Sequence, residues 1–424
     1  MAITDKTEGV WNTANAYKKD CQGGIWPEIN ENVLYSWGNS GFQTLRPSPS
    51  IPSDKVSSPV QVGDSSNTGW QLSKFAYRYP GGSPHRIGVH AIKTDGTLWA
   101  WGREEDGWFG VNTEATPTNS PKQIPGTWTH ISNGVAVAGI KADASLWTWG
   151  DNGGDEAGNL GLNDQVQRSS PTQIPGSYKS VAAFRDMAMN AVKTDGTLWG
   201  WGRQYRWGNT TLGGYTSSPT QVGTDTTWDS VDLTSAGNSC FTGIKTDGTL
   251  WVWGYGSANR GGQNQGTPAW NTSPRQVGTD TDWVRPTVGM GANWFWKGGS
   301  TKEMWCLGGQ FKKWGYLSGS VPTDVTTMSS PIQLLSTWNG ANWSGDGNET
   351  NVAVKSDGTM WAQGRAVEGL FMENHANDGT EISSPIQLTS ATSWQAPLII
   401  GGTPGNGTGA WLVAKTDVGT TSGV

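Results

Sequence analysis

Charged residues, cysteine and histidine are all scarce in this chain of 424 residues. Asp, Glu, Lys and Arg make up 15% of it, with 29 basic and 35 acidic side chains and a formal net charge of −6. Because there is no chain-wide basic field to attract phosphate groups, we predict that the protein does not bind nucleic acid. The three cysteines have no metal-type spacing, and the four histidines lack a spacing that brings two onto one zinc ion. We therefore predict no disulfide framework, no metal site and no cofactor.

Long apolar runs are missing as well. No stretch approaches the roughly 18 apolar residues of a membrane span. The N-terminus begins with acidic and polar residues where a secretory peptide needs a basic start and an apolar run. We expect a protein made in the cytoplasm, without a signal peptide or membrane insertion. The sequence also has no nucleophile elbow and no phosphate-loop context around its glycine pairs, and we predict that it is not an enzyme.

Glycine and tryptophan are abundant instead, at 61 and 27 residues, and they recur in a repeat. A Lys-Thr-Asp-Gly-Thr-Leu-Trp-x-Trp-Gly phrase occupies 93–102 and returns at 141–150, 193–202, 245–254 and 355–364, with a degraded copy at 304–308. The final glycines of successive copies lie 48 to 56 residues apart. A period of this length indicates a propeller or a solenoid.

A second phrase, of the type Ser-Ser-Pro-x-Gln, completes the unit. It occurs seven times, at Pro59, Pro121, Pro171, Pro219, Pro274, Pro331 and Pro385, and an aromatic residue follows each copy. Each unit then contains four short strands, of which the third and fourth form a hairpin. Asp-Gly between them predicts a type I′ turn, in which both residues take positive φ. Where Ala144 replaces the glycine, we expect a cost of about 1 kcal/mol or a different turn.

The two ends of the chain complement each other. The last unit stops just after Asp417, where its fourth strand should begin, and residues 33–38 near the N-terminus match a fourth strand without a preceding hairpin. Pairing 33–38 with 411–417 would remove two exposed sheet edges. We therefore predict an all-β fold, a seven-bladed β-propeller of four-stranded blades, closed by an N-terminal strand that completes the C-terminal blade. The predicted domains are an N-terminal arm, 1–30, and the propeller, 31–424.

These phrases resemble the regulator of chromosome condensation repeat family over roughly residues 33 to 418. The likeness rests on the Asp-Gly hairpins with their Trp-x-Trp-Gly endings and on Gly158-Asn159-Leu160-Gly161, which is similar to the Gly-Gln-Leu-Gly loop of that family. The resemblance implies a seven-bladed propeller closed by both termini. It also implies a range of functions: exchange factors for a small GTPase that dock on chromatin, inhibitors of β-lactamases, and structural proteins of tailed phages. The basic tail of a chromatin binder is absent here.

Three functional hypotheses follow. In the first, the chain is a non-enzymatic virion component of a bacteriophage, placed in the capsid, neck or tail, because Gly9–Tyr17 resembles the leader of phage proteins with these repeats. Its partners would be other virion proteins or a host-surface receptor. The second is a cytoplasmic regulatory module that resembles a GTPase exchange factor or an enzyme inhibitor. The third is a lectin-like propeller that binds carbohydrate through exposed aromatic residues.

The segments between the Trp-Gly and Pro-Gln phrases should emerge on one face of the ring. They are rich in Trp, Tyr and Arg, the residues that dominate interface energetics. We take this face as the candidate binding surface, and the alternative is that these side chains only pack the loops. The candidate residues are Arg103, Trp108, Phe109, Tyr205, Arg206, Trp207, Arg260, Trp270, Lys313, Trp314 and Tyr316.

The N-terminal arm is a second candidate. Its apolar side chains, Trp11, Tyr17, Ile25 and Trp26, would be costly to leave in water on a free tail. We predict that the arm docks on a neighbouring subunit or on a partner protein. Packing across the rim of the ring itself is the alternative.

Overall fold

The computed structural model contains only strands and connections within the residues that it describes. These are 33–39, 55–61, 69–78, 88–102, 107–112, 118–153, 158–184, 187–204, 207–208, 214–233, 240–255, 270–287, 292–298, 303–309, 327–333, 342–345, 350–367, 378–388, 392, 394–403 and 408–415. In the described part of the chain, no helix is long and apolar enough to span a bilayer. The all-β class predicted from the sequence is confirmed.

Up to residue 221, the described strands are β1 (Val33–Asn39), β2 (Lys55–Gln61), β3 (Trp70–Arg78), β4 (Gly88–Lys93), β5 (Thr97–Gly102), β6 (Thr118–Asn133), β7 (Ala136–Lys141), β8 (Ser145–Gly150), β9 (Arg168–Phe184), β10 (Ala188–Lys193), β11 (Leu198–Arg203) and β12 (Tyr215–Gln221). The second half forms β13 (Trp228–Leu233), β14 (Cys240–Lys245), β15 (Leu250–Tyr255), β16 (Trp270–Gln276), β17 (Trp283–Thr287), β18 (Ala292–Lys297), β19 (Glu303–Gly309), β20 (Thr327–Gln333), β21 (Asn342–Gly345), β22 (Thr350–Val354), β23 (Met360–Val367), β24 (Asp378–Gln387), β25 (Trp394–Thr403) and β26 (Thr408–Lys415).

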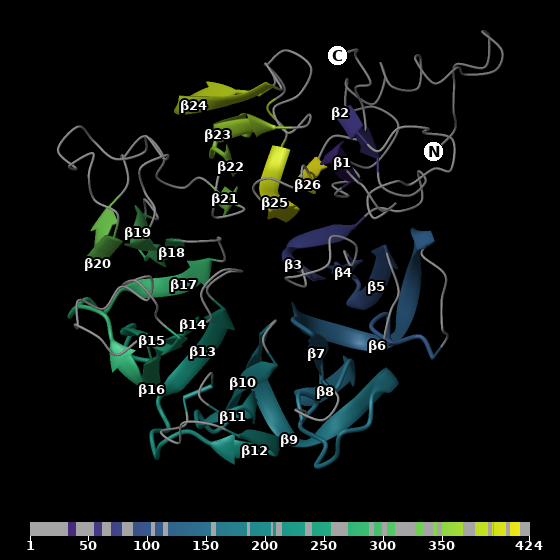
Figure 1. Cartoon of the computed structure of the whole chain (residues 1–424), viewed down its shortest axis with the longest axis vertical. Helices are drawn as coiled ribbons and strands as arrows, with labels where there is room; N and C mark the ends of the chain where they lie inside the picture. Colours follow the sequence, from purple (N-terminus) through teal and green to yellow (C-terminus); the bar gives the residue numbers. More distant parts are fainter. Residues whose placement is uncertain are drawn as a thin grey trace, which may run out of the picture.

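Antiparallel pairing groups these strands into seven four-stranded units arranged around a centre (Figure 1). Four of them are separate sheets, with the orders β2-β1-β26-β25, β13-β14-β15-β16, β17-β18-β19-β20 and β21-β22-β23-β24. The other three, β3–β6, β6–β9 and β9–β12, run on as one sheet because the long strands β6 and β9 each serve two units. We call each four-stranded unit a blade.

The two ends of the chain meet in one blade. Strand β1 lies between β2 and β26, and its pairing with β26 runs from Val33 opposite Lys415 to Gly38 opposite Ala410. Strands β25 and β26 of this blade contact β3, so that the blade lies beside the β3–β6 blade. The pairing predicted for residues 33–38 is therefore present in the structure, but the N-terminal segment supplies two strands of this blade, β1 and β2, and not the single strand that was predicted.

Both faces of a blade are buried against its neighbours. Strands β4, β7 and β10 each bury five of their six residues almost fully. The hydrophobic clusters lie between consecutive blades; one joins Leu98 and Trp108 of the β3–β6 blade to Trp128 and Trp149 of the β6–β9 blade. This arrangement explains the sequence of the strands, in which apolar residues do not alternate with polar ones.

The first strands of consecutive blades adjoin one another, and side chains bridge them. Ser132 Oγ accepts a hydrogen bond from the Ala183 N–H at 2.9 Å, across β6 and β9. Ser180 Oγ donates to the carbonyl of Val231 at 3.0 Å and accepts from the Val231 N–H at 3.1 Å, across β9 and β13. Groups of these first strands thus find partners although the strands do not pair directly with one another.

The hairpin turn differs from the predicted type I′ turn. Only the glycine takes positive φ, 81° at Gly96 and 83° at Gly196, and the preceding aspartates do not. The Gly96 N–H donates to the carbonyl of Lys93 at 2.9 Å. This is a three-residue connection that ends in a left-handed glycine. The predicted type I′ turn was wrong, because Asp followed by Gly suits the two-residue loop and the three-residue loop alike.

Ala144 keeps the same turn. It takes the left-handed conformation itself, with φ 64°, and its N–H donates to the carbonyl of Lys141 at 2.9 Å. Of the two expected outcomes, the structure shows the strained residue and not a different turn.

Candidate interaction surfaces

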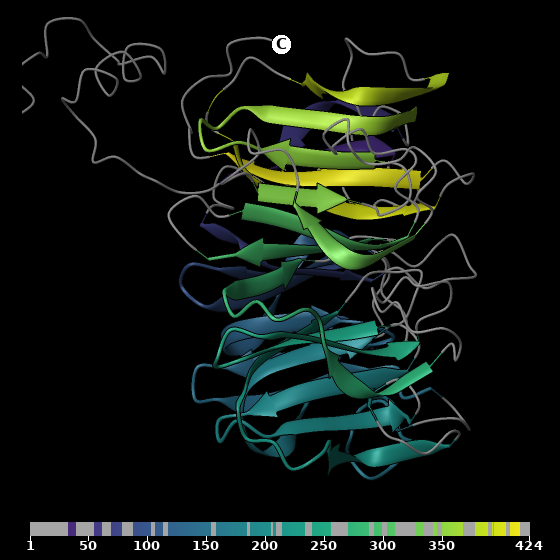
Figure 2. The ribbon, with the colours of Figure 1, turned by 90° about the vertical axis from the view of Figure 1, so that its left-hand side faces the viewer.

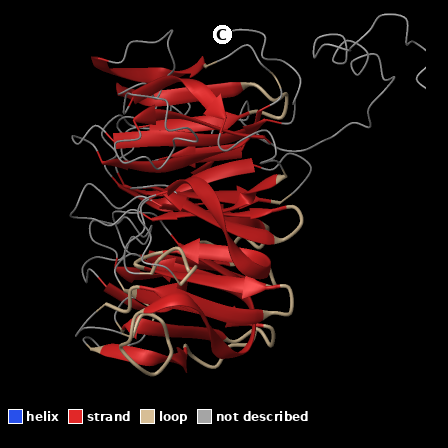
Figure 3. Ribbon diagram, turned by 90° about the vertical axis from the view of Figure 1, so that its right-hand side faces the viewer, coloured by secondary structure: helices blue, strands red, loops and turns tan. Residues whose placement is uncertain are grey.

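The connections between strands emerge on two opposite faces of the ring, because successive strands run in opposite directions across its thickness (Figures 2 and 3). We call one of them the turn face. It carries the hairpin turns at 93–97, 141–145, 193–197, 245–249 and 355–359. It also carries the connections between blades, which are the short segments 125–127 and 175–177 within the long strands β6 and β9 and the longer segments 223–227 and 278–282. The other is the loop face, which carries the described residues after the Trp-Gly phrases, among them 107–112, 151–153, 158–167 and 207–208.

Each complete hairpin on the turn face repeats the same polar relay. In the β9–β12 blade, Asp195 Oδ1 accepts hydrogen bonds from the N–H of Thr197 at 3.0 Å and from its hydroxyl at 2.6 Å. The indole N–H of Trp199 donates to the same hydroxyl oxygen at 2.7 Å. These bonds from Thr197 hold the pKa of Asp195 below its usual value. The same set recurs at Asp95, Asp143, Asp247 and Asp357, which confirms that these aspartates serve the turn.

A lysine lies beside the relay, between two aromatic rings. Lys193 Nζ lies 3.6 Å from the centroid of the Trp199 ring and 5.7 Å from that of Tyr178. Lys141 has the same surroundings, 3.7 Å from Trp147 and 5.0 Å from Trp128. Ammonium groups at such distances are attracted by the ring faces. The arrangement also occurs at Lys93, Lys245 and Lys297, and Lys355 Nζ lies 4.2 Å from the centroid of the Trp361 ring. We call it the lysine cage.

The structure corrects three of the proposed binding residues. Trp108 and Phe109 are 1% and 0% exposed, and Trp207 is 1% exposed. Their side chains fold back between the blades, where the glycines at 88 and 200 leave room: a Cβ atom at Gly88 would lie 2.2 Å from Trp108 Cζ3. These three residues pack the ring, as the alternative interpretation held, and do not offer their side chains to a partner.

The segment around Trp108 is a second copy of a loop that the sequence showed only once. Gly107–Gly110 forms a turn closed by the Gly110 N–H and the carbonyl of Gly107 at 3.1 Å, and Gly158–Gly161 forms the same turn with the same distance. In each case a tryptophan of the next blade, Trp149 or Trp201, donates its indole N–H to the carbonyl of the turn's second residue. The Gly-x-x-Gly spacing was the signal that could have identified the first copy.

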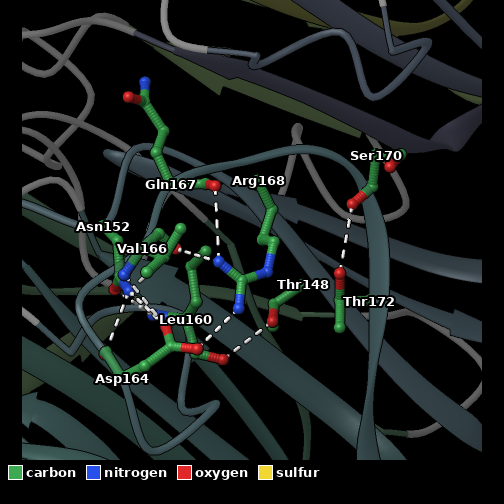
Figure 4. A network of polar contacts seen from close by, with 9 residues as sticks. All are labelled: Thr148, Asn152, Leu160, Asp164, Val166, Gln167, Arg168, Ser170 and Thr172. Carbon is green, nitrogen blue, oxygen red and sulfur yellow. Dashed lines mark hydrogen bonds and ion pairs between the residues drawn. The ribbon is translucent and has the colours of Figure 1, made fainter.

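Residues 151–153 and 158–168 of the loop face are joined by a polar network (Figure 4). Asn152 Nδ2 donates to the carbonyls of Asp164 and Val166 at 3.1 and 3.2 Å. Arg168 forms an ion pair with Asp164 at 2.5 Å and also donates to the Val166 carbonyl at 2.8 Å. The Leu160 N–H donates to Asn152 Oδ1 at 3.0 Å, which ties the network to the Gly158–Gly161 turn. The network holds Val166 in an exposed position, at 59% of its accessible surface.

The structure does not place the other candidates. Arg103, Tyr205, Arg206, Arg260, Lys313, Trp314 and Tyr316, and Trp11, Tyr17, Ile25 and Trp26 of the arm, lie outside the described residues. Trp270 is the first residue of β16 and pairs with Tyr255 of β15. The boundary at residue 30 also lies outside the described residues. The loop-face surface therefore remains a prediction, without Trp108, Phe109 and Trp207.

His90 is the one buried imidazole among the described residues. Its Nδ1 lies 3.1 Å from Nδ2 of Asn133, which places the ring proton on Nε2, and its ring packs 4.3 Å from that of Trp108. Burial lowers the pKa of His90 to about 3. This imidazole is neutral across the physiological range. In the described part of the chain, no group of three His, Cys, Asp or Glu side chains could hold a metal ion.

No family model matches the sequence, and a search of curated proteins finds no relative. Solved structures match almost the whole chain. A chain in the crystal structure of Kap60 bound to yeast RCC1 (Prp20) is 13% identical with a TM-score of 0.71, covering 98% of this chain and 96% of its own. Prp20p from Saccharomyces cerevisiae, described with its binding properties to Gsp1p and histones, is 14% identical with a TM-score of 0.69, covering 96% and 95%. Human WBSCR16 is 15% identical with a TM-score of 0.64, covering 91% and 98%.

These likenesses show the fold. The chain has the β-propeller fold of yeast RCC1, and the fold that the resemblance of its repeats implies is confirmed. The solved structures named above are not phage proteins, and the virion role stays a prediction.

Proposed function

We propose that the chain is a non-catalytic propeller that binds a partner protein. The observation that carries the proposal is the match to yeast RCC1 over nearly the full length of both chains, since that ring is seen in complex with another protein. Support comes from the chain itself. The blades are locked by buried tryptophans and by side-chain bonds between first strands, so the two faces are pre-organised surfaces, which reduces the entropy that binding has to overcome.

The hypothesis of a regulatory binding module fits the solved structures better than the hypothesis of a virion component. Prp20p is described with Gsp1p and histones as binding partners. Transferred to this chain, that description suggests a protein ligand of the small-GTPase kind, bound at a face of the ring. The formal net charge of −6 does not suit a chromatin-directed role. We therefore place the protein contact first and leave nucleic acid out of the proposal.

A cross-linking experiment tests the protein contact. The full chain, treated with a lysine-reactive cross-linker in lysate of its source organism, is expected to give cross-links from its exposed lysines to one partner. Purified partner should then bind the unmodified chain in a titration. If that partner is a GTPase, the ring should accelerate release of a fluorescent guanine nucleotide from it. A chain that gives no reproducible partner by either measurement contradicts the proposal.

The virion role is the second candidate, and its support is the resemblance of Gly9–Tyr17 to a phage leader. Mass spectrometry of purified particles tests it directly. Peptides of this chain at a fixed ratio to the major capsid protein would favour it, and their absence would remove it. The lectin-like alternative has lost one of its expected stacking residues, because Trp207 is buried.

A further inference from the structure

The lysine cages of the turn face differ in one respect, the connection that precedes the aromatic residue. In the β6–β9 and β9–β12 blades, three residues, 125–127 and 175–177, lead to Trp128 and Tyr178. In the β13–β16 and β17–β20 blades, five residues, 223–227 and 278–282, lead to Trp228 and Trp283. The longer connections carry aspartates and the shorter ones do not.

These aspartates neutralise the caged lysines of their own blades. Lys245 forms an ion pair with Asp225. Lys297 Nζ lies 2.7 Å from Asp280 Oδ2 and 3.7 Å from Asp282 Oδ1. The bond and charge of Lys245 help to lower the pKa of Asp225 to about 2, against the opposing effect of partial burial. A carboxylate is thus the group that these cages accept.

Lys141 and Lys193 have the same aromatic surroundings without that carboxylate. Their distances to Trp147 and Trp199, 3.7 and 3.6 Å, match the 3.7 Å of Lys245 to Trp251. Neither lysine forms an ion pair with another of the residues that the structure describes. Asp143 and Asp195 in their own turns are engaged by the hydroxyls of Ser145 and Thr197. Two half-buried ammonium groups in adjacent blades therefore lack the direct ion pair that Lys245 and Lys297 form, although Asp143 and Asp195 lie near enough to attract them.

We infer that Lys141 and Lys193 are a two-point anchor for the side-chain carboxylates of an acidic segment of a partner protein. The inference rests on the proposed protein-binding function and names the chemistry of one contact. The partner's carboxylates would take the places that Asp225 and Asp280 hold in the other two blades. Ion pairs with a half-buried ammonium are stronger than exposed ones, because solvent screens them less.

The aspartates of the turns do not prevent this contact. Asp247 occupies the same place beside Lys245 as Asp143 does beside Lys141, and Asp225 nevertheless pairs with Lys245. The net charge of −6 slows the approach of an acidic peptide at low salt, and it is largely screened at physiological ionic strength. The local arrangement therefore decides the affinity.

A fluorescein-labelled oligoglutamate peptide is the probe, with an oligoglutamine peptide of the same length as its neutral control. Anisotropy titration of the full chain should show binding of the acidic peptide only. The double variant Lys141→Met with Lys193→Met keeps the packing on the tryptophans and removes the charges. It should raise the Kd about tenfold or more, since each lost charged contact weakens binding severalfold. The matched double variant Lys245→Met with Lys297→Met changes the net charge equally and should leave the Kd within about twofold, because those lysines are already paired.

A second variant supplies the missing carboxylate within the chain. Replacing residues 125–127 by the sequence of 223–227 should bring an aspartate onto Lys141 and weaken peptide binding, while thermal melting shows a folded ring. The inference is overturned if the wild-type chain does not bind the acidic peptide, or if both double variants weaken it equally. Either result leaves the protein-binding function standing, because cross-links to a partner through the loop face would still be found.

Discussion

Ala144 stands in the left-handed position that glycine occupies in the equivalent turns. An L-residue pays about 1–2 kcal/mol for this conformation. We predict that Ala144→Gly raises the free energy of unfolding by about 1 kcal/mol, less than the full strain because glycine is also more flexible in the unfolded chain. Denaturant titration followed by tryptophan fluorescence measures the difference.

The opposite change in the next blade is the control. A Cβ atom at Gly196 would lie 1.9 Å from the Thr226 carbonyl oxygen, and the residue has φ 83°. Gly196→Ala should therefore destabilise the ring by more than Ala144→Gly stabilises it. Equal and small effects of the two substitutions would show that the left-handed turn is not under strain.

His90 makes the stability of the ring depend on pH. Its pKa is lowered to about 3 in the folded protein, whereas an imidazole in the unfolded chain takes up a proton near its model value of 6.5. The unfolded state therefore binds more protons as the pH falls below 6.5. The contribution of neutral His90 to the free energy of unfolding is therefore complete above pH 6.5. It is lost as the pH falls toward the pKa of the folded protein, by up to about 1.4 kcal/mol per pH unit.

Substitution of His90 by asparagine tests this dependence. Asn190 takes the equivalent place on β10, opposite Gly200 as His90 lies opposite Ala100. His90→Asn should flatten the fall in unfolding free energy between about pH 6.5 and 5, above the range in which most carboxylates take up protons. His130 is present in both proteins, so the difference isolates His90. An unchanged slope would mean that another group controls it.

At the scale of the strands, the repeat predicted the hairpins and the closing pair, because these follow from local phrases and from a count of strands. It did not predict the turn type. Asp-Gly suits both two- and three-residue connections, and the choice depends on the bonds from Thr97 to Asp95. The lysine cages were also missed, since the aromatic partner lies on another strand.

The binding residues were harder to assign for a different reason. Trp and Phe in a long loop serve an interface and an interior equally well. What decides for Trp108 and Trp207 is the pair of glycines, at 88 and 200, against which their rings lie. The sequence pattern gave no sign that these glycines make room for the two tryptophans, because they lie within strands of ordinary composition.

The contact between first strands can be tested at Ser180. Its hydroxyl serves both the N–H and the carbonyl of Val231, at 3.1 and 3.0 Å, and all three groups are buried. Ser180→Ala should lower the free energy of unfolding by about 1–3 kcal/mol, the cost of leaving buried polar groups unpaired. Thr172→Ala is the control, since that hydroxyl makes only an exposed bond of 3.4 Å to Ser170. A loss no larger than that of the control would show that water replaces the serine.

For the ring as a whole, the strand that joins the two ends is the critical element. Removal of residues 1–39 deletes β1, which leaves β2 without its partner strand and opens an edge on β26, because β1 pairs with both. We predict a lower Tm together with association through the exposed edges, since unpaired strands recruit other chains. Calorimetry and size-exclusion chromatography measure the two effects.

Removal of residues 1–30 alone separates closure from the predicted docking role of the arm. This shorter deletion retains β1, so the Tm of the ring should stay that of the full chain, while binding to a partner that contacts the arm should weaken. A fall in Tm equal to that of the longer deletion would show that the arm packs on its own ring. The longer deletion could instead leave a monomer with an unchanged cooperative transition. The other blades alone would then account for the stability of the ring, and the pairing of β1 with β26 would not be what closes it.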